Sequence, residues 1–262
     1  MRIRHGITAL ALVAAATLAL SSTAGAQTVI VDPGTALSAG KVIIGTGQNL
    51  PSLDSTGSWN IGSYPASQVN AYYSSGAAAA DQAEVAASAL AWSKSWVKKV
   101  CGSSKPAKVR ACKAAAVFDI DETLLSNYEW ISSLPVPFTY DVAASNAANQ
   151  NCTTPPIKAT LALFNSFKSM GVTPFLVTGR DESQRQTTEA CLAKAGITGY
   201  EALVLKPAGN TQSAAQRKAD QRKALISQGW KIGPSVGDQI SDMSNGSLTR
   251  GFLLPNAMYY LP

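Results

Sequence analysis

The chain of 262 residues carries 22 lysine and arginine residues against 16 aspartate and glutamate residues, and its formal net charge is +6 at pH 7. The basic residues are dispersed and are not interleaved with aromatic residues, so this composition argues against binding to a nucleic-acid polymer. The one histidine, His5, lies inside a predicted signal peptide, which excludes histidine-dependent catalysis and histidine metal ligation for the mature protein.

Residues 1–26 have the pattern of a secretory signal peptide. Two arginines precede an apolar run from Ile7 to Leu20, and Ala24-Gly25-Ala26 forms a small-residue cleavage site. The run is too short, and wrongly flanked, for a membrane-spanning helix. We therefore expect cleavage after Ala26, a secreted or periplasmic location, and no association with a membrane after cleavage.

Two segments of different composition follow the signal. Residues 27–66 are rich in Gly, Ser, Thr and Pro, which predicts an irregular arm with at most a short strand near 42–44. From residue 67 to 100 the chain is rich in alanine with large apolar residues at helical spacing, which predicts one or two helices. Trp92 and Trp96 fall on one helical face, and we expect them in the core.

The four cysteines indicate disulfide bonds. An even number in an exported protein favours pairing, and four cysteines allow three connectivities. Cys101 and Cys112 flank a polar loop, so we favour the pairs Cys101–Cys112 and Cys152–Cys191. The spacings match no zinc-binding signature.

Beyond residue 113, short apolar segments alternate with helical patterns. The alternation predicts an α/β fold with a parallel, Rossmann-like sheet that has helices on both faces. Residues 127–151, where aromatic residues occur among prolines and asparagines, are expected to form a small helical or irregular cap. We place the folded domain at 67–262, with strands at 114–118, 172–177, 202–205, 232–236 and 251–254 and helices at 155–170, 181–195 and 211–228.

Polar residues follow the predicted strands. The carboxyl ends of parallel strands share one edge of the sheet, and ligands bind outside that edge. Two carboxylates one residue apart repel each other unless a cation or a shared proton lies between them. Carboxylates without histidine or free thiolates suit a hard cation such as Mg²⁺. The residues concerned are Asp119 and Asp121 after the first strand, Thr178 after the second, Asp238 and Asp242 after the fourth, and Lys218 on the preceding helix.

These residues lie in segments that resemble a known superfamily. Residues 118–127, Phe-Asp-Ile-Asp-Glu-Thr-Leu-Leu-Ser-Asn, resemble the first motif of the haloacid dehalogenase (HAD) superfamily of phosphotransferases. Residues 177–180, Val-Thr-Gly-Arg, resemble its second motif, and residues 237–242, Gly-Asp-Gln-Ile-Ser-Asp, its fourth. Together with the ending at 254–260, they resemble the secreted acid phosphatase branch, which includes plant vegetative storage proteins and bacterial non-specific acid phosphatases. The resemblance runs from about residue 67 to the C-terminus, and residues 27–66 have no recognised counterpart.

The resemblance implies roles for individual residues. It implies that Asp119 is the nucleophile and a Mg²⁺ ligand, and that Asp121 is the general acid and base whose backbone carbonyl also binds the metal. Thr178, Gly179 and a lysine would hold the phosphoryl group. Asp238 would be a direct metal ligand, and Asp242 would act through water or orient the site.

The lysine of the third motif has more than one candidate. Residues 218–222, Lys-Ala-Asp-Gln-Arg, resemble the family run Lys-Ser-x-x-Arg with alanine in place of serine, so we assign Lys218. Lys206 is the alternative, and Lys223 is a more distant one.

The implied activity is a secreted, Mg²⁺-dependent acid phosphatase that hydrolyses small phosphomonoesters through an aspartyl-phosphate. Asp121 would have to be protonated when substrate arrives, and a neighbouring carboxylate would favour this by raising the pKa of Asp121. Two alternatives stay open: a storage or binding protein of the same fold with little activity, and a metal-dependent Asp-x-Asp glycosyltransferase. The presence of Asp119 disfavours the first, and the downstream motifs disfavour the second. The resemblance implies no particular substrate or oligomeric state.

Overall fold

Six parallel strands form one sheet in the order β1-β6-β5-β2-β3-β4. The computed structural model describes residues 42–45, 65–139 and 141–259, so the predicted signal peptide and most of the predicted arm lie outside the described residues. The predicted parallel sheet is confirmed. Its strands are β1 Val42–Gly45, β2 Ala114–Phe118, β3 Thr173–Asp181, β4 Leu203–Lys206, β5 Lys231–Gly237 and β6 Arg250–Leu253.

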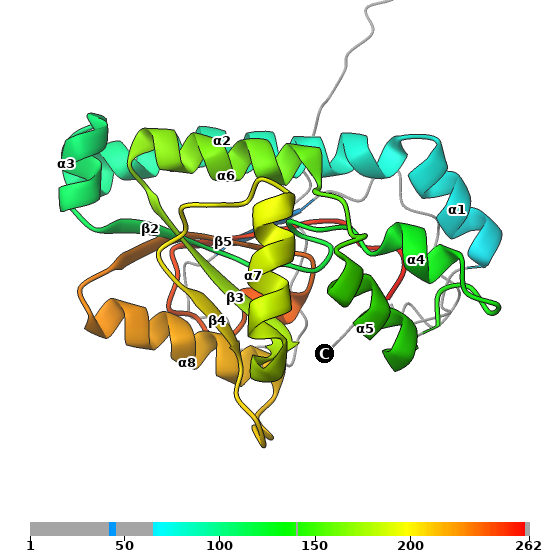
Figure 1. The fold of residues 1–262 in the computed structure, drawn as a ribbon. Helices are drawn as coiled ribbons and strands as arrows, with labels where there is room; N and C mark the ends of the chain where they lie inside the picture. The colour runs from blue at the N-terminus through cyan, green and yellow to red at the C-terminus, as the bar shows by residue number, and fades with distance from the viewer. Residues whose placement is uncertain (1–41, 46–64, 140, 260–262) are drawn as a thin grey trace, which may run out of the picture.

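Helices cover both faces of the sheet, as the alternating pattern predicts. Figure 1 shows α2 and α6 running side by side on one face and α8 on the other. The described helices are α1 Ala66–Ser74, α2 Ala77–Cys101, α3 Pro106–Ala111, α4 Tyr128–Ser132, α5 Val142–Asn151, α6 Lys158–Met170, α7 Arg185–Lys194 and α8 Ala214–Ser227. None of them combines the length and hydropathy that a bilayer crossing requires.

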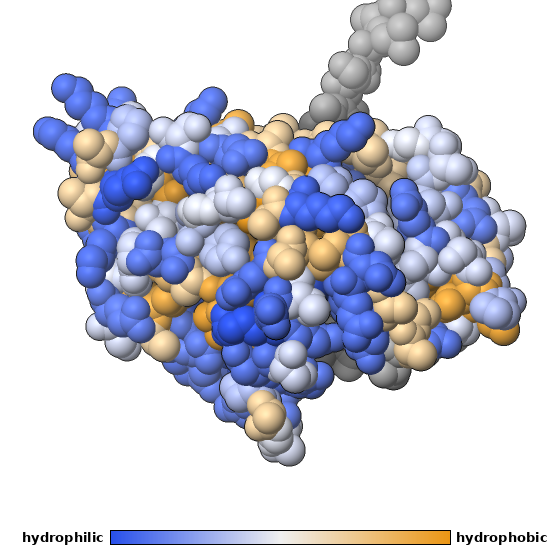
Figure 2. Space-filling model, viewed as in Figure 1, coloured by the Kyte–Doolittle hydropathy of each residue, from blue (hydrophilic) through white to orange (hydrophobic). Residues whose placement is uncertain are grey.

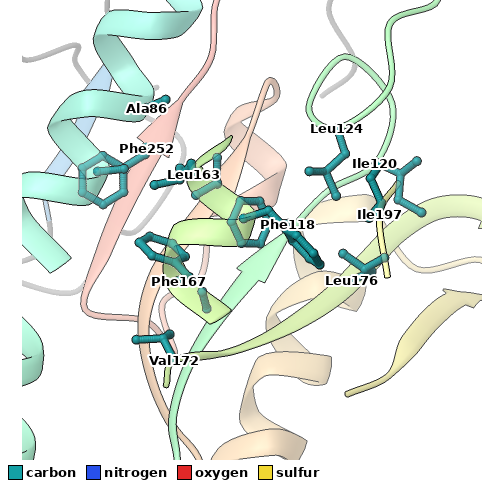
Figure 3. Close-up of a cluster of buried hydrophobic side chains, with 14 of the residues drawn as sticks. Ala86, Phe118, Ile120, Leu124, Leu163, Phe167, Val172, Leu176, Ile197 and Phe252 are labelled. Carbon is teal, nitrogen blue, oxygen red and sulfur yellow. The ribbon is translucent and has the colours of Figure 1, made fainter. Parts of the chain in front are cut away.

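The main core lies between the sheet and the helices α2 and α6. Every residue of β2 is buried, and this continuous apolar run is typical of a strand covered on both faces. Phe118 lies against Phe167, and Figure 3 shows both rings among the aliphatic side chains of this layer. Trp92 and Trp96 stack with ring centroids 5.8 Å apart, and Trp96 belongs to this core as predicted.

The short strand predicted within the arm is present as β1, and it pairs with β6, so this part of the arm belongs to the sheet. Two other local features differ from the sequence prediction. The polar loop between Cys101 and Cys112 contains α3, a six-residue helix that is too short to show a helical period. Strand β3 continues beyond Val177 to Asp181 and therefore includes the second-motif residues.

Both favoured disulfides are present. Cys101–Cys112 joins the end of α2 to the residues just before β2. Cys152–Cys191 joins the end of α5 to α7 across 39 residues. The second bond attaches the segment that contains α4 and α5 to the helix that follows β3.

Helices α4 and α5 form the excursion predicted between residues 127 and 151. Figure 1 shows them beyond the carboxyl ends of the central strands, on the side opposite α3. The aromatic residues of the excursion pack against α1: the rings of Tyr128 and Tyr73 stack at 4.4 Å, and Phe138 is buried beside them. Val136, in the loop after α4, is exposed, and Figure 2 shows hydrophobic residues at this end of the surface. The aromatic residues of the excursion thus pack against α1, whereas Val136 faces solvent.

Candidate active site

The carboxyl ends of β5, β2 and β3 lie side by side. Phe118, the last residue of β2, is opposite Leu176 of β3 and Val236 of β5. The backbone N–H of Asp119 donates to the carbonyl of Val236 at 3.0 Å, which fixes the start of the first motif beside the fourth. The register of the sheet therefore brings the three predicted motifs to one edge.

Lys218 links two of the predicted aspartates. Its Nζ lies 2.9 Å from Oδ1 of Asp119 and also contacts Oδ1 of Asp242. Burial alone lowers the pKa of Lys218, but the two carboxylates outweigh it and hold this pKa above its usual value. The side chain is therefore an ammonium ion at neutral pH.

The alternative lysine lies elsewhere. Lys206 Nζ pairs with Oδ1 of Asp181 at 2.9 Å, and both side chains are exposed. The structure therefore brings Lys218, and not Lys206, to the aspartates. Lys218 reaches the aspartates because it lies on the buried face of α8, together with Arg222, although the sequence of this helix is mainly polar.

Asp238 is held by neutral donors. Its Oδ2 accepts from Nδ2 of Asn256 at 2.9 Å and from Nε2 of Gln239 at 2.5 Å, and its Oδ1 accepts from the hydroxyl of Thr123 at 3.3 Å. Burial and the charge of Asp242 raise the pKa of Asp238 well above its usual value. No ion pair reaches Asp238 from any residue that the structure describes.

Three buried carboxylates have the arrangement of a metal site. Asp119, Asp238 and Asp242 each offer an oxygen within 4.8 Å of the others. Burial also raises the pKa of Asp119, and the nearby aspartates add to this against the opposing effect of Lys218. With all three ionised, one ammonium ion leaves two negative charges without direct compensation. An oxygen-only set with this deficit fits a divalent hard cation such as Mg²⁺.

Asp121 lies outside this carboxylate cluster. Its side chain forms a two-point ion pair with Arg180, from Nη2 to Oδ1 at 2.7 Å and from Nε to Oδ2 at 2.9 Å. Nδ2 of Asn127 also donates to Oδ1, at 3.0 Å. Burial raises the pKa of Asp121, but Arg180 outweighs it and leaves this pKa below its usual value. The expected rise in the pKa of Asp121 is therefore wrong, because nothing in the order of residues pairs Arg180 with it.

Glu122 connects the first motif to the C-terminal segment through hydrogen bonds. Its carboxylate accepts from the backbone N–H of Asn127 at 2.6 Å and from the hydroxyl of Tyr259. Burial, with the charge of Asp121, raises the pKa of Glu122 to about 7. The residue has φ of 50°, in the left-handed region, which turns its side chain away from the extended direction of β2.

Arg222 holds the loop that follows β5, which carries Asp238 and Asp242, through hydrogen bonds to the backbone of that loop. This side chain is fully buried and donates to the backbone carbonyls of Asp242, Ser244 and Gly246. A Cβ on Gly237 would lie 2.0 Å from Oδ2 of Asp242, so only glycine fits there. The backbone of Gly237 thus lies directly against the side chain of Asp242.

Thr178 is fully buried at the end of β3, while Gly179 is exposed. The Thr178 hydroxyl accepts from the backbone N–H of Arg180 at 3.2 Å. Its carbonyl accepts from Nη1 of Arg217 at 2.9 Å, so a buried guanidinium on α8 holds the end of this strand. Both predicted phosphate-binding residues of β3 therefore lie next to Arg180 and to the buried face of α8.

Several polar residues that donate hydrogen bonds to the motif carboxylates had no role assigned from the sequence. Two of them, Asn256 and Tyr259, lie in the C-terminal segment whose pattern supported the family resemblance. The others lie inside the quoted motifs, where a polar residue next to a buried strand could have been the signal. They are Thr123, Asn127, Arg180 and Gln239.

The chain matches one protein family and is similar to several curated proteins. The family described as HAD superfamily, subfamily IIIB (Acid phosphatase) matches residues 51–262. The chain is similar to acid phosphatase 1 of Solanum lycopersicum, with 34% identity over 148 residues that cover 55% of this chain and 58% of that protein. It is also similar to vegetative storage protein 1 of Arabidopsis thaliana, with 30% identity over 154 residues that cover 56% and 55% of the two chains. The similarity thus spans somewhat more than half the length of these relatives.

A solved structure has a similar fold. The class C acid phosphatase from Bacillus anthracis superposes with a TM-score of 0.55 at 18% sequence identity, and the match covers 72% of this chain and 82% of that one. At this identity the likeness supports the fold, and the roles of the site residues depend on the geometry described above.

Proposed function

The chain belongs to subfamily IIIB of the HAD superfamily, the acid phosphatases, and from that premise we propose that it hydrolyses small phosphomonoesters through an aspartyl-phosphate with the help of Mg²⁺. The observation that carries the proposal is the cluster of Asp119, Asp238 and Asp242, in which Asp119 and Asp242 contact the ammonium group of Lys218. A metal-binding carboxylate beside a cationic donor is the arrangement that phosphoryl transfer requires.

The proposed first step is attack by Asp119 on phosphorus. Asp119 follows the central strand β2, and its contacts with Val236 and Lys218 restrict its position. An oxygen of Asp119 forms a bond to phosphorus while the bond to the ester oxygen breaks, and Asp121 gives a proton to the leaving oxygen. Arg180 lowers the pKa of Asp121 in the free protein, so Asp121 must gain this proton before the step. In the second step a water molecule attacks phosphorus, Asp121 takes the proton of that water, and Asp119 is released as a carboxylate.

The remaining residues would hold the phosphoryl group and the metal. We propose that Thr178, Gly179 and Lys218 bind phosphoryl oxygens, as donors at the shared strand edge. Asp119, Asp238 and Asp242 would hold Mg²⁺, with the backbone carbonyl of Asp121 as a further ligand. Bound Mg²⁺ would supply positive charge that keeps the carboxylates ionised and offsets charge on the phosphoryl oxygens.

We also propose export and a division of the chain. The signal pattern of residues 1–26 and the two disulfide bonds support a secreted or periplasmic protein. Residues 67–262 would form the phosphatase domain, with the excursion at 127–151 as its cap.

The alternative is a storage or binding protein, and similarity to a vegetative storage protein keeps it in view. The contact of Lys218 with Asp119, and the position of Asp238 within 4.8 Å of Asp119, favour the enzyme, because a chain without activity has no need to hold buried carboxylates together.

The test is hydrolysis of p-nitrophenyl phosphate by the mature chain with Mg²⁺, with EDTA, and with Mg²⁺ restored. We expect turnover that EDTA abolishes and Mg²⁺ restores. Asp119→Ala should remove it, whereas the control Asp220→Ala, at a carboxylate on α8 whose side chain is 39% exposed, should retain it. Absence of metal-dependent turnover in the wild type would sink the enzyme proposal, and normal turnover in Asp119→Ala would refute the nucleophile.

A further inference from the structure

One end of the molecule carries a local excess of positive charge. Residues 85–118 contain seven basic residues and no acidic residue, although basic residues are dispersed over the chain as a whole. All seven residues are exposed, and none forms an ion pair with another residue that the structure describes. They are Lys94, Lys98, Lys99, Lys105, Lys108, Arg110 and Lys113.

The fold gathers these residues at the amino ends of the central strands. Cys101–Cys112 joins the end of α2 to the residues before β2, and α3, which lies between the two cysteines, packs on α2, α6 and β2. Lys231, the first residue of β5, is also exposed, and its backbone N–H donates to the carbonyl of Lys113 at 2.8 Å. Figure 1 shows α3 and the end of α2 together at one end of the molecule, and Figure 2 shows hydrophilic side chains projecting from that end. We call the seven residues and Lys231 the basic end.

Helix dipoles account for only half of this charge. Cations are favourable near the C-terminus of a helix, and four of the eight residues lie in the last turns of α2 and α3. The other four have no such reason. Lys105 is the N-cap residue of α3, where the helix dipole disfavours a cation, Lys94 lies in the body of α2, and Lys113 and Lys231 lie just before and at the start of strands. The charge at the basic end thus exceeds what the helices require, which indicates an anionic partner outside the chain.

The neighbours of the basic end restrict the class of partner. The exposed large hydrophobic residues of the described chain are Val136, in the loop after α4, and Ile226, on α8, and neither belongs to the basic end. Trp230 lies close by but is packed, with its ring centroid 5.0 Å from that of Phe175 and with Nζ of Lys113 over its face. Among the described residues the basic end therefore has no apolar anchor for a bilayer and no free aromatic ring on which nucleotide bases could stack. Its lysines can bind a partner only through charge.

We propose that the basic end binds an acidic polysaccharide, a linear polymer with carboxylate or sulfate groups along its length. A flexible polymer of this kind can follow cations that belong to α2, α3 and two strands, and lysine pairs with its anionic groups as separate point charges. This site is distinct from the proposed active site and does not depend on the proposed function. Lys113 precedes β2 and Asp119 follows it, and the five residues of the strand span about 17 Å. The separation exceeds the Debye length of roughly 8–10 Å near physiological salt, so polymer bound at the basic end leaves the active-site charges unchanged.

The experiment measures the Kd of the mature, disulfide-bonded chain for dextran sulfate. Because the contacts are ionic, we expect the Kd to rise by about tenfold or more between roughly 50 and 200 mM sodium chloride. A triple variant with Lys94→Gln, Lys105→Gln and Lys108→Gln should raise the Kd by about tenfold at the lower salt concentration. The matched control removes the same number of charges at exposed lysines outside the basic end, and it should raise the Kd by less than about threefold. Its changes are Lys158→Gln, Lys194→Gln and Lys223→Gln.

Equal weakening in the two triple variants would overturn the proposal, because net charge alone would then explain binding. Absence of binding at the lower salt concentration would overturn it as well. Inorganic phosphate, compared with chloride at equal ionic strength, should not displace the polymer. Displacement by phosphate would place the polymer at the active site and reject the basic end as its binding surface.

Two other polyanions test the class of partner. Vesicles that contain phosphatidylglycerol, and a DNA duplex, are compared with dextran sulfate at equal salt and equal concentration of anionic charge. Tighter binding to the vesicles would reassign the basic end to a lipid surface, and tighter binding to DNA would reassign it to nucleic acid; either result rejects the polysaccharide. Thermal unfolding checks that both triple variants fold. If the first one does not, Lys105→Gln against Lys158→Gln gives the same comparison with a smaller expected shift.

Discussion

Replacing Lys218 with methionine should cause the largest combined loss of stability and activity among single changes on α8. Lys218 is buried, and it is the one cationic side chain in contact with the carboxylates of Asp119 and Asp242 among the described residues. Methionine keeps much of the length and apolar stem but leaves two buried carboxylates facing each other. Removal of one partner from a buried ion pair typically costs about 3–5 kcal/mol. For a domain of this size we expect the unfolding temperature to fall by roughly 10 °C or more.

The pH dependence provides a second readout of the same change. Burial raises the pKa of Asp119 in the folded protein, and loss of Lys218 should raise it further. A carboxyl group whose folded pKa is raised contributes stability at pH values below its unfolded pKa and loses that contribution as the pH rises. Without metal, the stability of the Lys218→Met variant should therefore fall more steeply than that of the wild type as the pH rises from about 4 to about 8. Mg²⁺ should restore part of the lost stability.

The assay is thermal unfolding in EDTA and in Mg²⁺ at several pH values, together with turnover of p-nitrophenyl phosphate. Lys223→Met is the matched control, because Lys223 lies on the same helix in an exposed pair with Asp220 at 3.7 Å. We expect little change in that variant, and a loss of turnover of about 10²–10³-fold in Lys218→Met. If the two variants unfold at the same temperature in EDTA, the buried charge cluster does not have the energetic role assigned to it.

Three further outcomes follow from the same contacts. In EDTA the free energy of unfolding of the wild type should fall by up to roughly 3 kcal/mol as the pH rises from about 4.5 to 7, because Glu122, with a pKa of about 7, keeps a proton that the unfolded chain releases. In thermal unfolding, Glu122→Gln should make stability less dependent on pH in this range. Gly237→Ala should weaken Mg²⁺ binding by about 10–100-fold in a metal titration of activity, because its Cβ would displace the Asp242 carboxylate; wild-type affinity would contradict the close approach. Serine at both Cys152 and Cys191 should lower the free energy of unfolding by roughly 4 kcal/mol in a denaturant titration, and a change below about 1 kcal/mol would show that the segment with α4 and α5 is held mainly by packing.

The strands and helices of the domain were accessible from the sequence because their signals are local. The run at 114–118 is apolar throughout and ends abruptly at Asp119, which identifies a buried strand and its carboxyl end together. Helix α3 was not predicted, because six residues are fewer than two helical turns and show no helical period. Strand β1 could be expected only weakly, because its partner β6 lies about 200 residues further along the chain.

The sequence by itself determined which strand ends carry the chemistry, since Asp119, Thr178 and Asp238 each follow an apolar run and parallel strands align their ends. Only the tertiary structure decided between Lys218 and Lys206, because that choice depends on which face of α8 turns toward β2. The tertiary structure also decided the direction in which the pKa of Asp121 is shifted. From sequence this carboxylate had only a like-charged neighbour, but the fold places Arg180 against it and reverses the expected direction of its pKa. Charge interactions act through space over a few ångströms, and the chain order does not contain those distances.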